Sequence, residues 1–166
     1  MDRRTFLKSV MVLGLGILTV SFKPRLVRSG ESDEFFEITR TDDEWRSLLT
    51  PEQYNVLRNE KTEPPFKNTY HDNKVRGDYL CAGCDLPLFS SDAKFDSHSG
   101  WPSFWQPISE SAIRTRTDWK LIYPRTEVHC RRCGGHQGHL FKDGPPPTGL
   151  RYCINSAALK FIAGQS

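Results

Sequence analysis

The chain has 166 residues, with 23 Lys and Arg against 20 Asp and Glu, and 37% of its residues are hydrophobic. This length suits one domain with a buried core, and the ordinary charge content, with 11% aromatic residues, excludes a wholly disordered chain. The only long apolar run covers residues 10–22. A membrane-spanning helix needs roughly 20 apolar residues, so a multi-pass membrane protein is excluded.

Positive charge is concentrated at the start of the chain. Residues 1–29 hold six basic residues and one acidic residue, whereas residues 30–166 hold 17 basic and 19 acidic residues, a net charge of −2. A body with this balance has no general attraction for nucleic acid, so we expect no nucleic-acid partner.

The first 29 residues have the pattern of a targeting segment. Residues 2–8 read Asp-Arg-Arg-Thr-Phe-Leu-Lys and resemble the twin-arginine export signal of bacteria, with a mildly apolar run behind them. The alternative is a basic flank before an uncleaved membrane anchor. We assign residues 1–29 to an export signal or anchor, 30–36 to a linker and 37–166 to the functional domain. The expected location is the bacterial periplasm or the outer face of the cytoplasmic membrane, with membrane contact only through an uncleaved leader.

Two short helices are expected before a region of β structure. Four-residue patterns that begin at Thr41 and Thr50 and end in Glu or Gln are typical of capping boxes at helix starts. After about residue 77 the sequence pattern changes, and runs such as 113–117 and 119–123 alternate apolar with polar side chains. We therefore predict a mainly β fold with antiparallel sheets.

Four of the five cysteines form two Cys-x-x-Cys pairs, each beside glycine: Cys81 with Cys84, and Cys130 with Cys133. Two intervening residues allow a tight turn to present both sulfurs to one ion, and two such turns complete a tetrahedral four-sulfur zinc site. The pairs are 45 residues apart, so distant hairpins must converge on the metal. The alternative is a pair of redox motifs. A closed site of this kind predicts one structural Zn²⁺ whose binding stabilises the fold.

The fifth cysteine, Cys153, lies in a polar stretch. Arg151 and Asn155 are each two positions away, so on a strand they share the face of Cys153. A nearby cation lowers the pKa of a thiol, and the thiolate is the nucleophile. Cys153 is therefore either a catalytic thiol or a buried apolar cysteine in a strand.

Several motifs together resemble the B-type methionine sulfoxide reductases, from about residue 35 to residue 161. They are Gly-Trp-Pro-Ser-Phe at 100–104, the His-Cys segment at 129–133, His-Gln-Gly-His-Leu-Phe at 136–141, Asp-Gly-Pro at 143–145 and Arg-Tyr-Cys-Ile-Asn-Ser at 151–156. The resemblance implies two antiparallel sheets with short N-terminal helices. It also implies a structural zinc held by the four paired cysteines, away from the active site.

The resemblance also implies the reaction and its residues. The enzyme would reduce the R epimer of methionine sulfoxide, with Cys153 as nucleophile, Trp101 receiving the substrate methyl group and His139 protonating the sulfoxide oxygen. The other residues that match the site are His136, Asp143, Arg151 and Asn155. Thiolate attack on the sulfoxide sulfur would give methionine and a sulfenic acid on Cys153.

The sequence departs from the family pattern at three points, one of which is His98, where a glycine is common. Ser99 stands where many members carry a resolving cysteine, so the sulfenic acid needs an external thiol, either a small molecule or a thioredoxin-like protein. Gln137 replaces a frequent leucine.

Two other interpretations are a zinc-stabilised binding module without catalysis and a general thiol oxidoreductase. The retention of Cys153, His139 and Trp101 opposes the first, and the second needs a reactive cysteine pair outside the metal site.

Overall fold

The computed structural model describes residues 35–164, which belong to one compact unit. The predicted export leader, residues 1–29, lies outside the described residues, as does the linker up to residue 34. Between residues 35 and 164, no helix is both long and apolar enough to cross a membrane.

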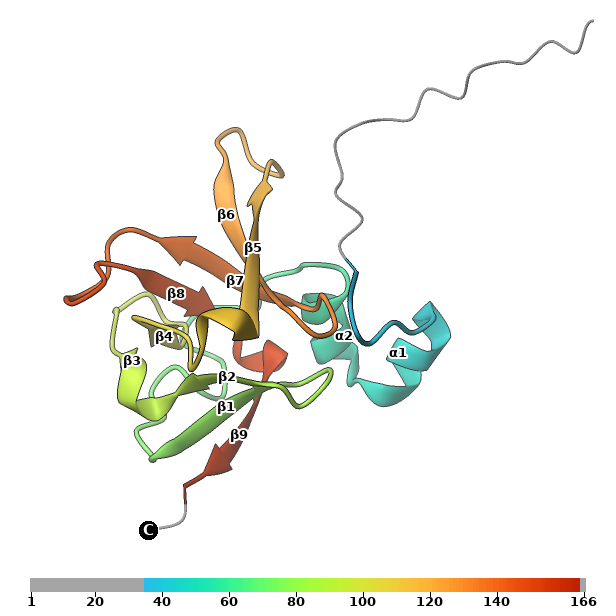
Figure 1. Cartoon of the computed structure of the whole chain (residues 1–166), viewed down its shortest axis with the longest axis horizontal. Coiled ribbons are helices and arrows are strands. Elements are labelled where there is room, and N and C mark those ends of the chain that lie inside the picture. Colours follow the sequence, from blue (N-terminus) through green and yellow to red (C-terminus); the bar gives the residue numbers. More distant parts are fainter. Residues whose placement is uncertain (1–34, 165–166) are drawn as a thin grey trace, which may run out of the picture. The chain divides into compact units, whose positions relative to one another are not determined.

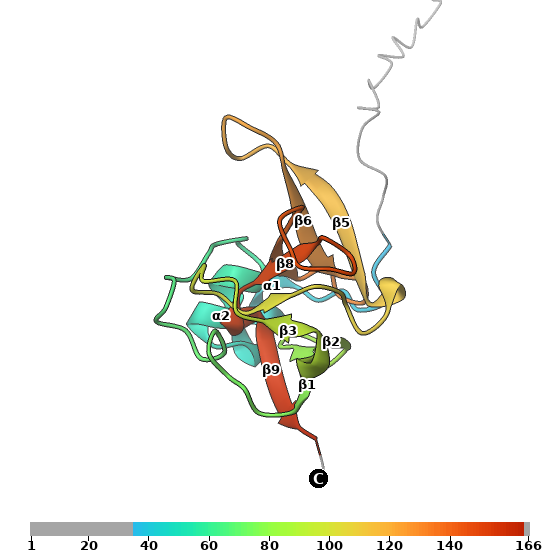
Figure 2. The same ribbon diagram turned by 90° about the vertical axis from the view of Figure 1, so that its left-hand side faces the viewer.

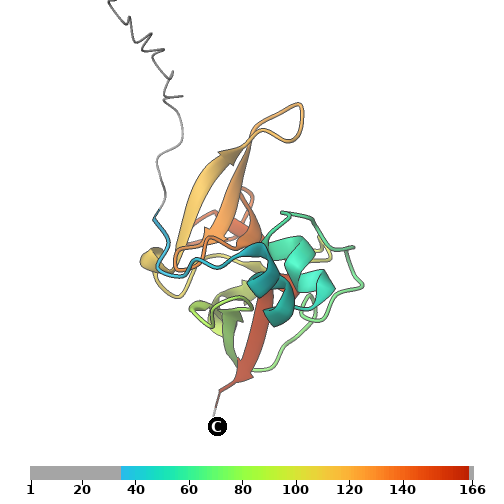
Figure 3. The same cartoon turned by 90° about the vertical axis from the view of Figure 1, so that its right-hand side faces the viewer.

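Two short helices open the domain and lie together on one side of it (Figure 3). They are α1 (Asp42–Leu48) and α2 (Pro51–Leu57). Both predicted capping boxes are confirmed: the Thr41 hydroxyl accepts a backbone N–H at 3.3 Å, and the Thr50 hydroxyl accepts one at 3.2 Å. Each such cap stabilises its helix by about 1 kcal/mol. The helices bury Trp45 and Leu57 toward the sheets.

Nine strands form two antiparallel sheets, which confirms the predicted fold class (Figure 1). The three-stranded sheet has the order β2 (Pro87–Ser90), β1 (Gly77–Cys81), β9 (Leu159–Ala163). The six-stranded sheet has the order β3 (Lys94–Phe95), β4 (Ser103–Phe104), β8 (Arg151–Ile154), β7 (His136–Phe141), β6 (Arg125–Cys130), β5 (Ile113–Asp118). Three short 3-10 helices, η1 (Ser91–Ala93), η2 (Glu110–Ala112) and η3 (Ser156–Ala158), precede β3, β5 and β9.

The core lies where aromatic side chains of the two sheets meet. Phe89 of β2 stacks on Phe104 of β4 with 4.5 Å between ring centroids, and Tyr79 of β1 meets Phe104 edge-on at 5.1 Å. All three rings are fully buried. Aromatic burial of this extent dominates the energetics of a small core, so this contact fixes how the sheets pack.

Strand β7 contains a bulge. Val128 of β6 pairs with Gly138, but the next residue, His129, pairs with His136, so Gln137 is an extra residue in β7. Gly138 is needed beside the bulge, because a Cβ there would lie 2.0 Å from the backbone oxygen of Cys153. This close approach of β7 to β8 brings the histidines of β7 alongside Cys153.

One strand prediction is wrong. Residues 119–123 do not form a strand, because β5 ends at Asp118 and β6 begins at Arg125. The alternating pattern of this run has no neighbouring sheet against which to bury one face, and its large apolar side chains stay exposed. Residues 119–124 are instead the tip of the β5–β6 hairpin, which stands out from the body of the domain (Figure 2).

Candidate active site and metal centre

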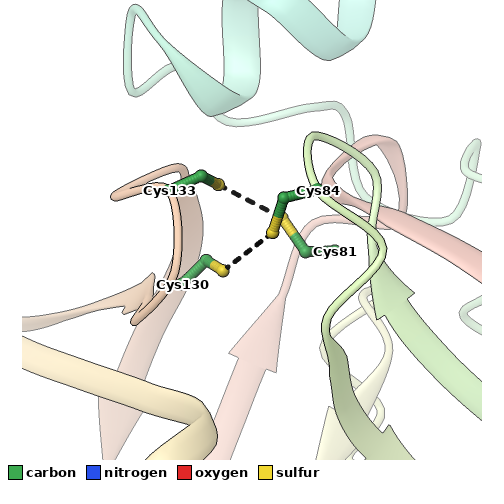
Figure 4. Close-up of side chains that lie close together, drawn as sticks. All are labelled: Cys81, Cys84, Cys130 and Cys133. Atoms are coloured by element: carbon green, nitrogen blue, oxygen red, sulfur yellow. Dashed lines mark hydrogen bonds between the residues drawn. The ribbon is translucent and has the colours of Figure 1, made fainter. Parts of the chain in front are cut away.

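The two Cys-x-x-Cys pairs converge, as the sequence predicts (Figure 4). All four sulfur atoms lie within 4.8 Å of one another. The Sγ atoms of Cys81 and Cys133 are 3.7 Å apart, and those of Cys84 and Cys130 are 3.4 Å apart. In a tetrahedron with metal–sulfur bonds of about 2.3 Å, the sulfurs are separated by roughly 3.8 Å. The cluster therefore has the dimensions of a four-sulfur metal centre.

Tight turns and the helices enclose this cluster. One turn closes with Asp85 N–H donating to Cys81 O at 2.9 Å, and the other with Gly134 N–H donating to Cys130 O at 2.9 Å. Trp45 and Leu57 from the helices pack on Gly83, between the paired cysteines of the first turn. A metal held here would have four sulfur ligands and no open coordination position, which is the arrangement of a structural site.

Gln137, the bulge residue, supports the cluster through its side chain. That side chain is fully buried, and its Nε2 donates to Cys81 Sγ at 3.5 Å and to Gly135 O at 3.1 Å. Among residues 35–164 its Oε1 finds no hydrogen-bond partner. A buried amide that directs its donor to a sulfur is well matched to a thiolate ligand, because the anion accepts the stronger hydrogen bond.

The bulge also brings His136 and His139 together. The two residues are three positions apart, so in a regular strand they would face opposite sides of the sheet. With the extra residue between them, their rings meet edge-on with centroids 5.3 Å apart. Both histidines matched by the resemblance therefore belong to one site.

Each histidine is held by a carboxylate of the β5–β6 hairpin. His139 Nε2 lies 2.8 Å from Asp118 Oδ2, and His136 Nδ1 lies 2.7 Å from Glu127 Oε1. Arg125 donates to Asp118 at 2.6 Å, and Arg116 forms an ion pair with Glu127. These two carboxylates orient both imidazole rings.

The two carboxylates stay ionised despite their burial. Burial raises the pKa of Glu127, but hydrogen bonds from His136 and Arg116 outweigh it and hold the pKa at about 2. Burial also raises the pKa of Asp118, yet the Lys120 backbone N–H, His139 and Arg125 bring it well below its usual range. Each carboxylate therefore supplies a negative charge beside a histidine at neutral pH.

Cys153 lies directly opposite His139. The two are register partners on β8 and β7, so their side chains leave the same face of the sheet with Cβ atoms about 5 Å apart. Burial raises the pKa of the Cys153 thiol, while the Ser99 hydroxyl, 3.9 Å from its sulfur, and the Arg151 guanidinium lower it. The prediction that Arg151 lies on the side of Cys153 agrees with this electrostatic contact.

Arg151 is held in place by Asp143. Two parallel hydrogen bonds of 2.8 Å join its guanidinium to the carboxylate, and the cation also lies 4.3 Å above the centroid of Phe141. A planar fork bound in this bidentate way has a defined orientation. Asp143 therefore positions the cation that acts on Cys153.

Asn155 supports the site through the backbone. Its Nδ2 donates to Gln137 O at 3.0 Å, and its Oδ1 accepts the Glu63 N–H at 3.2 Å. The side chain is buried, and both its amide nitrogen and its amide oxygen have hydrogen-bond partners within the protein. The structure thus places Asn155 as a brace between β8, the bulge of β7 and the segment around Glu63.

The segment around Glu63 also fixes the orientation of the Trp101 indole. Its Nε1 donates to Glu63 O at 3.0 Å, and the indole, partly exposed, forms one wall of a cleft of about 680 Å³. Phe66 and Phe95 also line this cleft. The Glu63 carboxylate in turn accepts backbone N–H groups of Ser156 and Ala157, so it anchors η3, the short helix after β8.

Sequence reasoning missed three residues of this site: Glu63, Asp118 and Glu127. Asp118 and Glu127 stand in runs of alternating charged residues that are typical of a solvent-facing strand, and Glu63 precedes two prolines as if in a loop. All three are nearly or fully buried, with the Asp118 side chain 8% exposed. No local pattern distinguishes a buried acid from an exposed one, because the difference depends on partners distant in the chain.

The fold and the site define a β-sheet protein with a cysteine–histidine centre and a separate four-sulfur metal centre. A family model described as the SelR domain matches residues 49–163. The peptide methionine sulfoxide reductase MsrB of Thiobacillus denitrificans is 56% identical over 122 residues, which cover 74% of this chain and 92% of that protein. The chain therefore belongs to the SelR family, the B-type methionine sulfoxide reductases.

Two further relatives show how widely this likeness extends. The peptide methionine sulfoxide reductase MsrB of Leptospira interrogans is 51% identical over 126 residues, covering 76% of this chain and 96% of that protein. The chloroplastic peptide methionine sulfoxide reductase B1 of Arabidopsis thaliana is 47% identical over 156 residues, covering 93% of this chain and 76% of that protein.

The contact of Gln137 with Cys81 predicts a role in metal affinity. Gln137→Leu keeps the buried volume but removes the N–H donor to the sulfur, so the affinity for the bound metal should fall about 10–100-fold. Competition with a chromophoric chelator measures this affinity. Gln106→Leu, at an exposed position, is the matched control. Equal metal affinity in the two variants would contradict the role of Gln137.

The position of Arg151 predicts a change in the titration of Cys153. Arg151→Met removes the cation that lowers the pKa of the thiol, so the pKa should rise and the thiolate fraction at neutral pH should fall. Below this pKa, a tenfold smaller thiolate fraction should slow alkylation of Cys153 about tenfold. The pH dependence of alkylation, read by mass spectrometry of the Cys153 peptide, measures this. Arg76→Met, an exposed position paired with Asp92, should leave it unchanged.

Proposed function

We propose that this chain reduces the R epimer of methionine sulfoxide, free or within proteins, by direct attack of the Cys153 thiolate on the sulfoxide sulfur. The observation that carries the proposal is the pairing of Cys153 with His139 across β8 and β7. Two electrons pass from the cysteine sulfur to the substrate sulfur as the S–O bond breaks. The S–S bond formed by the attack also breaks, the oxygen passes to the Cys153 sulfur as a sulfenic acid, and methionine leaves.

His139 supplies the proton that the sulfoxide oxygen needs as charge develops on it. Burial lowers the pKa of His139, and the hydrogen bond to Asp118 opposes that effect. The Asp118 carboxylate stabilises the imidazolium, so the buried histidine can carry a proton and release it during the reaction. His136, edge-on to the same ring, is a second polar group available to the oxygen.

The other site residues orient the reacting groups. Arg151, held by Asp143, and Ser99 favour the thiolate of Cys153 against the effect of burial. Trp101, two residues before the register partner of Cys153, offers a partly exposed indole for the substrate methyl group, and Asn155 braces the strand that carries Cys153. Once the methyl group and the side-chain arm of the substrate are placed, chirality at sulfur decides whether the oxygen points toward the histidines.

The sulfenic acid is reduced by an external thiol, either a small molecule or a thioredoxin-like protein. Ser99, in the loop before Trp101, has its hydroxyl 3.9 Å from the Cys153 sulfur, and a hydroxyl cannot form a disulfide. The remaining four cysteines belong to the metal cluster. One thiol from the reductant must therefore form a mixed disulfide with Cys153 and a second must release it.

The metal of the four-sulfur cluster is zinc. Four thiolates at tetrahedral separations suit Zn²⁺, which would be held by Cys81, Cys84, Cys130 and Cys133. When bound, zinc supplies folding free energy by joining β1 to β6 and takes no part in the reaction. The alternative function, a zinc-stabilised binding module without catalysis, leaves the Cys153–His139 pair without a use and is not favoured.

Loss of Cys153 should abolish the reaction without disturbing the metal. Cys153→Ser should reduce neither N-acetyl-methionine-R-sulfoxide nor an oxidised peptide, while wild type should reduce the R epimer of each and leave the S epimer unchanged. Chromatography of the two epimers measures turnover, and elemental analysis should find about one zinc per chain in both proteins. Substantial turnover by Cys153→Ser would refute the assignment of the nucleophile.

We propose further that residues 1–29 direct export of the folded enzyme through the twin-arginine route, to the bacterial periplasm or the outer face of the cytoplasmic membrane. The paired Arg3 and Arg4 before Phe-Leu-Lys support this. Arg3→Lys with Arg4→Lys should leave the protein in the cytoplasm of a bacterial host, as cell fractionation would reveal. Arg25→Lys is the matched control. Export of the double variant at the rate of wild type would contradict the route.

A further inference from the structure

The tip of the β5–β6 hairpin, residues 119–124, exposes a concentrated group of large apolar side chains. Ten large hydrophobic side chains are exposed between residues 35 and 164, and four of them lie within five consecutive positions of this tip. They are Trp119, Leu121, Ile122 and Tyr123, of which Ile122 is fully exposed and Trp119 is 72% exposed. Contiguous exposed apolar surface of this kind is typical of interaction sites, whereas isolated apolar residues are ordinary.

The hairpin tip is joined directly to the reaction centre. Asp118 ends β5, immediately before the tip, and its carboxylate holds His139 Nε2 at 2.8 Å. Arg125, immediately after the tip, donates to the same carboxylate at 2.6 Å. His139 in turn is the register partner of Cys153. The tip is therefore an extension of the wall of the site, fastened at its base by the groups that orient the histidine.

Charge around the tip favours an apolar partner over an anionic one. Lys120, the cation within the tip, forms an ion pair with Glu60, and Arg125 at its base is paired with Asp118. Phospholipid headgroups and nucleic acids are attracted chiefly by unneutralised basic groups. Both cations here are already paired with carboxylates, so what the tip offers is apolar and aromatic surface.

We infer that the hairpin tip is the surface on which a polypeptide substrate docks the apolar residues that flank its oxidised methionine. The inference rests on the proposed function. In an unfolded substrate the chain is extended, and six residues span up to about 20 Å. Glu127 of β6 pairs with His139, and Ile122 of the tip is five residues before Glu127, a span of about 17 Å at about 3.3 Å per residue. A segment whose sulfoxide reaches Cys153 can therefore extend along the hairpin to its tip. A folded protein keeps those apolar neighbours in its core and cannot offer them.

The test compares two substrates of the same chemistry. Trp119→Ser with Ile122→Ser removes two side chains of the tip, and both are exposed, so the fold should be retained, as circular dichroism and melting would verify. For β-casein, an unfolded protein oxidised beforehand with peroxide, KM should rise about tenfold, the effect of losing a strong contact residue. For N-acetyl-methionine-R-sulfoxide, kcat/KM should not change. Ile162→Ser, at an exposed position of β9 in the other sheet, is the matched control and should alter neither.

Binding separates this inference from the proposed function. Cys153→Ser, with and without the two tip substitutions, is titrated into fluorescently labelled oxidised β-casein, and the tip substitutions should weaken binding by a similar factor. If wild type reduces neither substrate, the proposed function fails while this binding measurement still decides the role of the tip. Equal effects of the tip substitutions on both substrates, or no effect on casein, would overturn the inference. So would unchanged casein kinetics together with tip-dependent co-sedimentation with phosphatidylglycerol vesicles, which would assign the tip to a membrane.

Discussion

Beyond their aromatic core, the two sheets of this domain are connected at the four-cysteine cluster, which joins the turn after β1 to the turn after β6. Cys81 ends β1 of the three-stranded sheet and Cys130 ends β6 of the six-stranded sheet, while Cys84 and Cys133 lie in the turns that follow these strands. Strand β6 lies between β7, which carries His136 and His139, and β5, which ends in Asp118. A contact that fixes the end of β6 therefore also fixes the position of both neighbouring strands. A metal held by the cluster would act on the candidate site through these strands.

The bulge at Gln137 connects the cysteine cluster to the candidate active site. The extra residue sends one side chain to the cluster sulfur, and it places His136 and His139 beside each other. Its backbone oxygen receives two hydrogen bonds from Asn155, which fastens the end of β8 to β7. A single irregularity in one strand thereby connects the metal centre, the histidine pair and the strand of the reactive thiol.

The electrostatics of the site act on Cys153 and His139, the nucleophile and the acid of the proposed reaction. Burial raises the pKa of Cys153 and lowers that of His139, which disfavours the charged form of each. Arg151 and Ser99 oppose the first effect, and Asp118 opposes the second. Burial is the larger effect in both cases, so the pKa of Cys153 stays above its usual value and that of His139 stays below it, while Arg151 and Asp118 are the charges that limit these shifts.

Local patterns in the sequence predict much of this arrangement. Local patterns identify the threonine caps, the two Cys-x-x-Cys turns and the alternating strands, because each of these features depends on residues only a few positions apart. The run 119–123 misleads because alternation alone does not reveal whether a neighbouring strand exists. The partners of His136 and His139 escape prediction because Glu127 and Asp118 become buried only when β5, β6 and β7 are paired in register. The bulge in β7 is not predicted either, because it interrupts the two-residue alternation by which strands are identified.

The most direct test of this account is a single turnover with methionine-R-sulfoxide in the absence of reductant, followed by trapping and mass spectrometry of every cysteine. The account predicts one sulfenic acid, on Cys153, with the metal retained and Cys81, Cys84, Cys130 and Cys133 unmodified. A disulfide between Cys153 and one of those four, with release of the metal, would contradict both the one-cysteine reaction and the separation of the two centres.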